Sequence, residues 1–150
     1  MSSLEAAQAA LAAEHAAVYG YGVVGGRVAA GRRTEAHQAY DAHRARRDSL
    51  VRTVRDLGGK PVAASAAYAL PFKVAGPADA VRLAAELEDR VADVYSDLVR
   101  AARGPLRHEA ALALREAAVR AARWRGADSV AFPGLVERAA ASAGKGTTHV

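Results

Sequence analysis

The sequence predicts an all-α protein, a four-helix bundle made of two antiparallel hairpins joined by a long crossover. Three observations predict it. Alanine, the strongest helix former, supplies roughly a quarter of the 150 residues, whereas aromatic residues supply only 5%. Four segments carry helix start signals and an apolar spacing near 3.6 residues. The stretch between the second and third of them, residues 58–75, lacks that spacing and is expected to be the crossover.

The first two predicted helices form the first hairpin. Ser2 and Glu5 have the spacing of a capping box, and the helix that they begin is expected to end near Val28. Glycines in its second half each cost about 1 kcal/mol relative to alanine, so we expect a neighbouring helix to approach closely there. Thr34 is a suitable cap for the second helix, which is expected to end before Gly58.

The third and fourth helices, expected near residues 77–103 and 105–124, each open with a Gly-Pro pair, because proline fits the first helical position. The crossover can traverse a helix of about 36 Å, since an extended chain advances about 3.3 Å per residue. The second and third helices can therefore run parallel. A short segment after Trp124 is expected to pack on the bundle end, which gives a bundle domain over residues 1–138 and a flexible tail over residues 139–150.

Composition and charge argue against several classes of protein. Arginine supplies 18 of the 21 basic residues, and the net charge of +5 is scattered among acids along the whole chain. No aromatic residues interleave with the arginines of the second helix, and no phosphate-binding loop is present, so we do not expect nucleic-acid binding. No apolar run is long enough to span a membrane and no signal-peptide pattern begins the chain, so we expect a cytoplasmic protein without membrane contact.

A weak internal repeat places the same two residues on the first and third helices. Shifting the sequence by 74 residues aligns Glu14 with Glu88 and Tyr21 with Tyr95. Seven residues make two helical turns, so each tyrosine lies on the same face as the carboxylate that precedes it. That face is apolar, and an inward carboxylate is costly unless it is paired or binds a metal ion.

The geometry of the hairpins indicates partners for both acids. Counting back from the two short turns places Glu14 opposite Arg46 and Arg47, and Glu88 opposite Arg120, within several residues. Bidentate pairing between arginine and a carboxylate would neutralise both inward acids. We therefore expect two buried ion pairs at the centre of the bundle.

Four stretches of the sequence are similar to an uncharacterised ferritin-like domain family of high-GC bacteria, within a resemblance that covers about residues 4–135. They are Leu11–Gly25, His43–Asp48, Tyr68–Pro71 and Trp124–Arg125. The resemblance implies the ferritin-like fold, whose di-iron members add Glu-x-x-His on the second and fourth helices. This sequence contains no Glu-x-x-His, and arginines fall at the depth of the ligands. Because a guanidinium cannot ligate iron, we expect no iron and no other cofactor.

The expected function is therefore that of a ferritin-like protein of unknown physiological role that has lost its di-iron site and acts as a structural, interaction or small-ligand-binding module. The alternative is a divergent carboxylate-bridged oxidase or storage protein that binds iron. Its metal ligands would be Glu14, His43, Glu88 and Glu116. A lone histidine on a core-facing stripe, as at position 43, is more often a hydrogen-bonded packing residue than a ligand.

Two further expectations concern activity and assembly. The chain has no cysteine, no Gly-x-Ser-x-Gly and no evident Ser-His-acid set, which favours a protein that is not an enzyme and leaves the question open. An alanine-rich bundle has little bulk with which to fill a wide core, so docking a second copy would bury more surface. We therefore expect a homodimer, with its small-molecule ligand unknown.

Overall fold

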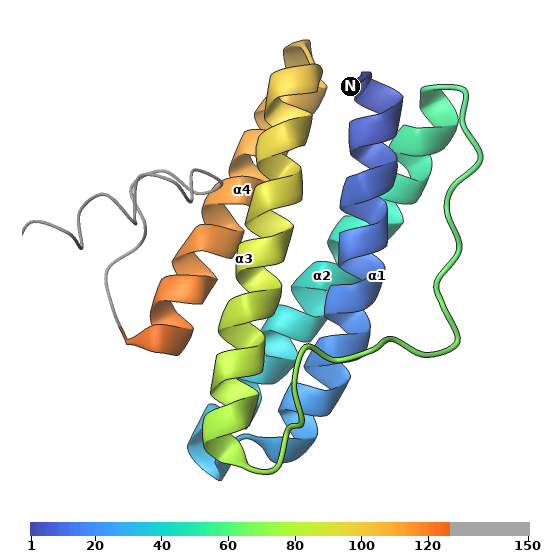
Figure 1. Ribbon diagram of the computed structural model, residues 1–150. Helices are drawn as coiled ribbons and strands as arrows, with labels where there is room; N and C mark the ends of the chain where they lie inside the picture. The colour runs from blue at the N-terminus through green and yellow to red at the C-terminus, as the bar shows by residue number, and fades with distance from the viewer. Residues whose placement is uncertain (127–150) are drawn as a thin grey trace, which may run out of the picture.

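The computed structural model describes residues 1–126, which form four α-helices and a single short 3-10 helix and contain no strand (Figure 1). The helices are α1 (Ser3–Arg27), η1 (Ala30–Arg32), α2 (Arg33–Asp56), α3 (Pro77–Ala101) and α4 (Gly104–Arg125). The all-helical prediction is thus confirmed for this part of the chain. The predicted C-terminal segment and tail, from residue 127 onward, lie outside the described residues.

The start of α1 follows the predicted capping box. The Ser2 hydroxyl accepts a hydrogen bond from the Glu5 backbone N–H at 3.1 Å, and the Glu5 carboxylate accepts one from the Ser2 backbone N–H at 2.7 Å. The start of α2 differs from the prediction, because α2 begins at Arg33 and Thr34 is not its cap. The preceding turn, η1, leads directly into α2, since the Arg33 N–H bonds to the carbonyl of Ala30.

The helices of the second hairpin begin close to their Gly-Pro pairs. Pro77 is the first residue of α3, as predicted, while α4 begins at Gly104, one residue before the expected start. Gly126 ends α4 in the left-handed conformation, with φ of 65°, and its N–H bonds to carbonyls of the last helical turn. A glycine is suited to this position because it has no Cβ to clash.

The four helices are arranged so that α1 and α3 form the centre of the bundle. α1 packs against α2 and α3, and α3 also packs against α4 (Figure 1). α1 and α3 are antiparallel, and the Ser3 hydroxyl bonds to the Ala101 carbonyl where the start of α1 meets the end of α3. The crossover returns the chain to the opposite end of the bundle, so that α2 and α3 run parallel (Figure 1).

The crossover is tied to the outer side of α1. The Gln8 side chain donates to the Lys60 carbonyl at 2.6 Å and accepts from the Val62 N–H at 2.9 Å. Further along, the rings of Tyr19 and Tyr68 are 5.4 Å apart. These contacts span about three turns of α1 and fix the path of a segment that has no regular structure.

Alanine dominates the buried surfaces between helices. The buried alanines of α1, α3 and α4 are Ala6, Ala7, Ala10, Ala17, Ala80, Ala84, Ala85, Ala92, Ala110, Ala113, Ala117 and Ala121. The close approach expected at the α1 glycines occurs at Gly20, where an added Cβ would lie 2.5 Å from Leu87. It does not occur at Gly22, Gly25 or Gly26, where a Cβ would meet nothing within 4 Å. Within residues 1–126, no helix is both long and apolar enough to cross a membrane.

Candidate functional site

Three charged residues lie buried at the centre of the bundle, one on each of three helices. Glu14 comes from α1, His43 from α2 and Glu88 from α3, and their exposed fractions are 0%, 1% and 0%. They lie between two apolar clusters that fill the two ends of the bundle. Charged groups are rarely found in such a place unless each has a partner.

His43 is the link between the two acids. Its Nδ1 lies 2.6 Å from Glu14 Oε2, and its Nε2 lies 3.0 Å from Glu88 Oε1. A neutral imidazole has a single N–H, so one of its nitrogens would direct a lone pair at a carboxylate oxygen. Only the imidazolium donates on both sides, and the geometry therefore fits a positively charged ring between two carboxylates.

The environment of His43 favours the same protonation state. Burial by itself lowers the pKa of the imidazole, but hydrogen bonds to Glu14 and Glu88 and the negative charges of both acids outweigh burial. Together they raise the pKa of His43 to about 9. The ring is therefore charged at neutral pH.

Each tyrosine of the repeat donates to the acid on the opposite helix. The Tyr21 hydroxyl of α1 donates to Glu88 Oε1 of α3 at 2.6 Å, and the Tyr95 hydroxyl of α3 donates to Glu14 Oε1 of α1 at 2.7 Å. Burial and the neighbouring carboxylates raise the pKa of both tyrosines well above its usual range. Both phenols thus remain protonated as donors, and the repeat forms a reciprocal pair of links between α1 and α3.

α4 contributes two side chains to the margin of this cluster. The Trp124 indole N–H donates to the Tyr21 hydroxyl at 2.9 Å, and the indole is 2% exposed. The Arg120 guanidinium lies 4.0 Å from Glu88 Oε2, which is beyond hydrogen-bond distance. Glu88 Oε2 is a buried atom without a hydrogen-bond partner. Its compensation is the positive charge of the guanidinium nearby.

The predicted arginine partners of Glu14 are wrong. Arg46 instead donates to Glu116 at 2.9 Å, and Arg47 pairs with the adjacent Asp48 at 2.8 Å. His43, one turn before these arginines on α2, takes the inward position. A flat imidazolium has two donors, both of which are used here, whereas a guanidinium there would bring five that need acceptors. The predicted contact of Arg120 with Glu88 is present only as the longer ion pair described above.

The four residues of the alternative metal site are not all brought together. Glu14, His43 and Glu88 meet, but the Glu116 side chain is 48% exposed and is held by Arg46. Within residues 1–126, no group of three or more His, Asp or Glu side chains is arranged to hold a metal ion. Each nitrogen of His43 faces a carboxylate, so neither lone pair is available to a metal without loss of a hydrogen bond.

Two of these roles were not predicted from the sequence. The sequence places His43 on a core-facing stripe of the second helix, but it does not indicate that this residue bridges both acids. The feature that could have indicated this role is the position of His43 on the apolar stripe of α2, one turn before the residues that counting places opposite Glu14. Trp124 is the single tryptophan of the chain and belongs to one of the stretches that carry the resemblance, but nothing local indicates that its N–H supports Tyr21.

The comparisons with known proteins identify a family without assigning an activity. The family described as a domain of unknown function, DUF4439, matches residues 6–137. The chain is similar to the conserved hypothetical protein rv2844 from Mycobacterium tuberculosis, for which there is a crystal structure. The identity is 37%, the TM-score is 0.80, and the match covers 83% of this chain and 95% of that chain. No curated protein matches significantly. The chain therefore belongs to the DUF4439 family.

Proposed function

We propose that this chain is a ferritin-like bundle that has lost a di-iron site and acts as a structural, interaction or small-ligand-binding module. The connectivity supports the proposal, because two antiparallel hairpins are joined by one long crossover. The repeat supports it too, since Glu14 and Glu88 are buried on α1 and α3, where a di-iron member would have two of its carboxylate ligands.

The observation that carries the proposal is the position of His43 between the two acids. A di-iron centre of this kind needs a carboxylate from each of two helices and a Glu-x-x-His from each of the other two. Here α2 supplies one imidazole, and α4 supplies a guanidinium and an indole in place of ligands. The residues therefore do not fit two iron ions, and the imidazolium supplies positive charge between the carboxylates.

The proposed role is structural at the site itself. The cluster is closed, because every donor of His43, Tyr21 and Tyr95 is used within it and each side chain is at most 3% exposed. An active site needs a path for substrate and a group that is free to react. Function then depends on the outer surfaces of the bundle, as in an interaction module.

One observation favours the alternative of a carboxylate-bridged metalloprotein. Glu88 Oε2 is buried and has no hydrogen-bond partner, as expected of a ligand atom. In that case Arg120 would have to move away, and Glu116 would have to leave Arg46 to complete the set. Iron binding would then depend on both Glu88 and Glu116.

Iron titration distinguishes the metal-free module from the metalloprotein. The purified protein is titrated with ferrous iron without oxygen, followed by elemental analysis and by absorbance after exposure to air. We expect no tightly bound iron. Two tightly held irons per chain, lost in both Glu88→Gln and Glu116→Gln, would contradict the proposal and establish the alternative.

The protonation of His43 provides a second and independent test. In nitrogen NMR at neutral pH, both ring nitrogens of His43 should carry protons. His15→Gln serves as the matched control for assignment, because the His15 ring bonds to the Val62 carbonyl of the crossover and to neither buried acid. A neutral His43 ring would contradict the positive charge that the proposal places between the two carboxylates.

The proposed module is a cytoplasmic homodimer. Its support is the alanine-rich core, which buries little side-chain volume per helix and would gain from a second copy. Sedimentation velocity at tens of micromolar tests the assembly. A monomer at that concentration would leave the metal-free bundle intact as a proposal and remove the dimer.

A further inference from the structure

α2 and α4 are joined across the bundle by side chains rather than by close packing. α1 packs on α2 and α3, and α3 packs on α4, but α2 and α4 do not pack closely against each other. Near the end of α4, the Arg32 guanidinium donates to the carbonyls of Arg123 at 3.2 Å and Trp124 at 3.4 Å. About halfway along, Arg46 of α2 donates to Glu116 of α4 at 2.9 Å. Within residues 1–126 no further hydrogen bond or ion pair crosses this boundary, which we call the α2–α4 seam.

Two guanidiniums of the seam converge on one carboxylate oxygen. Arg46 donates to Glu116 Oε2 at 2.9 Å, and Arg120, one turn along α4, lies 3.9 Å from the same oxygen. The Arg46 and Arg120 side chains are 28% and 22% exposed, whereas the Glu116 side chain is 48% exposed. Arg120 forms no hydrogen bond with the described residues, since its second carboxylate neighbour, Glu88, is 4.0 Å away. The two cations therefore lie deeper in the seam than the acid between them, which can turn toward solvent with little loss of stability.

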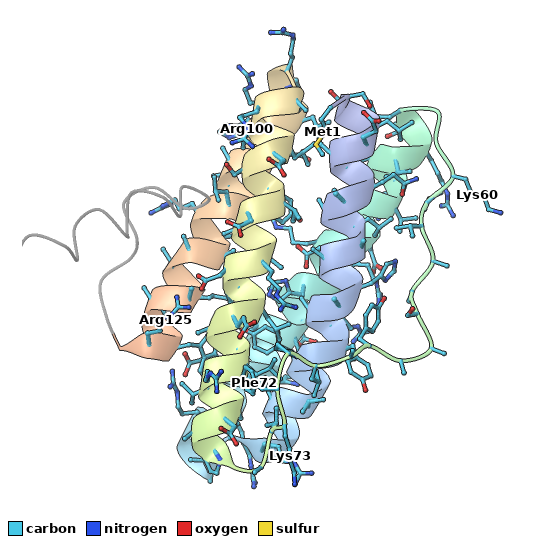
Figure 2. All side chains as sticks on the ribbon, viewed as in Figure 1. Met1, Lys60, Phe72, Lys73, Arg100 and Arg125 are labelled. Atoms are coloured by element: carbon cyan, nitrogen blue, oxygen red, sulfur yellow. The ribbon has the colours of Figure 1, made fainter. Side chains whose placement is uncertain are left out.

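A small cleft lies in the seam beside the guanidinium of α2. Its volume is about 20 Å³, which admits one water-sized or methyl-sized group. Three leucines, one from each of α2, α3 and α4, form its apolar part, and its lining residues include Arg46, Ser49, Leu50, Leu98, Leu106 and Glu109. The crossover contributes no lining residue. Lys60, near the start of the crossover, lies on the side of the bundle opposite to Arg125 of α4, so the crossover leaves the seam uncovered (Figure 2).

We propose that the α2–α4 seam binds small monocarboxylates with a short aliphatic chain. The carboxylate of the ligand takes the place of the Glu116 carboxylate, where Arg46 and Arg120 converge. Guanidinium groups suit this role, because their paired N–H donors match the two oxygens of a carboxylate. The aliphatic end enters the cleft against its three leucines. Glu116, itself a carboxylate on a short apolar stem, is then an internal competitor that closes the site when no ligand is bound.

The charge and the size of the cleft restrict the ligand. Glu109 lines the cleft and opposes a second negative charge at the aliphatic end, which favours monocarboxylates over dicarboxylates. The small volume restricts the chain to about the length of propionate. The proposal names a ligand for the small-ligand-binding module and therefore rests on the proposed function, because iron binding would engage Glu116 elsewhere.

Titration of the full chain with sodium propionate tests the site. Nitrogen–proton NMR spectra are recorded on protein shown to be free of iron, at an ionic strength held constant with sodium chloride, and the amides of Ser49 and Leu106 report on the cleft. Glu116→Gln should bind propionate about fivefold more tightly than the parent protein, because the internal competitor has lost its charge. Asp48→Asn is the matched control: it makes the same change of charge at the ion pair with Arg47, outside the cleft, and should leave the affinity unchanged.

A second pair of variants tests the cation of α2. Adding Arg46→Gln to Glu116→Gln should abolish the gain in affinity, whereas adding Arg44→Gln, at an exposed arginine of the same helix, should keep it. Equal affinities in the parent protein and Glu116→Gln, or the same gain in Asp48→Asn, would overturn the proposal. Phosphate or succinate binding as tightly as propionate would also overturn it, because the seam would then attract any anion. Absence of propionate binding in a protein that binds no iron would overturn this site and leave the proposed function standing, whereas two tightly held irons per chain would remove both.

Discussion

His43 is the residue whose charge holds the buried cluster together, so stability should fall as this ring loses its proton. The ordinary pKa of histidine is 6.5, and in the folded protein it is about 9. A raised pKa means that the folded state binds the proton more tightly than the unfolded state. The contribution is therefore complete below pH 6.5 and is lost as the pH rises through about 9.

The magnitude follows from the same two values. Each pKa unit corresponds to about 1.4 kcal/mol, so the shift makes the free energy of unfolding about 3 kcal/mol smaller at high pH than at low pH. For a bundle of this size that is a large share of a total of about 5–15 kcal/mol. The change should be easily resolved in urea unfolding.

The assay is urea unfolding from about pH 6 to about pH 9.5 on three proteins. The parent protein should lose up to about 3 kcal/mol over that range. His43→Gln should be less stable at about pH 6, because it leaves two buried carboxylates without a cation, and its stability should change much less with pH. His15→Gln, whose ring contacts a crossover carbonyl, should keep the slope of the parent.

Ending the measurements at about pH 9.5 separates the effect of His43 on stability from that of the two tyrosines. Tyr21 and Tyr95 also have raised pKa values in the folded state, so they too lose their contribution as pH rises. That loss begins only near pH 10, where an unfolded tyrosine ionises. A parent profile without slope below pH 9.5, or a His43→Gln profile with the full slope, would refute the buried imidazolium.

Two further predictions concern the tyrosines of the cluster and the glycines of α1. Tyr95→Phe should lower the free energy of unfolding by about 1–3 kcal/mol, because one oxygen of Glu14 loses its donor, and Tyr21→Phe should cost more, since its hydroxyl also accepts from the α4 indole. Equal losses in urea unfolding would contradict that order. Gly22→Ala should raise the thermal midpoint, by up to about 1 kcal/mol in stability, because its Cβ enters open space. Gly20→Ala should lower it, because its Cβ would lie 2.5 Å from an α3 leucine.

The helices could be predicted because their signals are local. The capping box at Ser2, the Gly-Pro pairs and the 3.6-residue apolar spacing each act within a few residues, and each was found where expected or within one or two residues. Burial of Glu14 and Glu88 followed from the same spacing. Periodicity within one helix reports which face is buried, so these features did not require knowledge of the other helices.

Pairing across helices could not be predicted with the same accuracy. Counting back from the first turn placed Arg46 and Arg47 opposite Glu14, and the residue found there is His43, three to four positions away. Such an error equals one helical turn, which keeps the same face and changes the side chain. The count through the first turn also did not include the short η1 helix that precedes α2.

The buried charges bear on how an alanine-rich core fixes the register of its helices. Alanine methyls at successive turns are nearly equivalent, so sliding α1 along α3 by one turn would replace many alanine contacts with others of the same kind. The polar cluster has no such equivalence. A slide of one turn, about 5.4 Å, would break the Tyr21–Glu88 and Tyr95–Glu14 hydrogen bonds together and leave buried carboxylates short of donors. A buried ion pair adds little net stability compared with apolar packing, but it penalises every other register strongly. In a core with so few large side chains, the cluster is therefore the part of the interface that selects one arrangement of the helices.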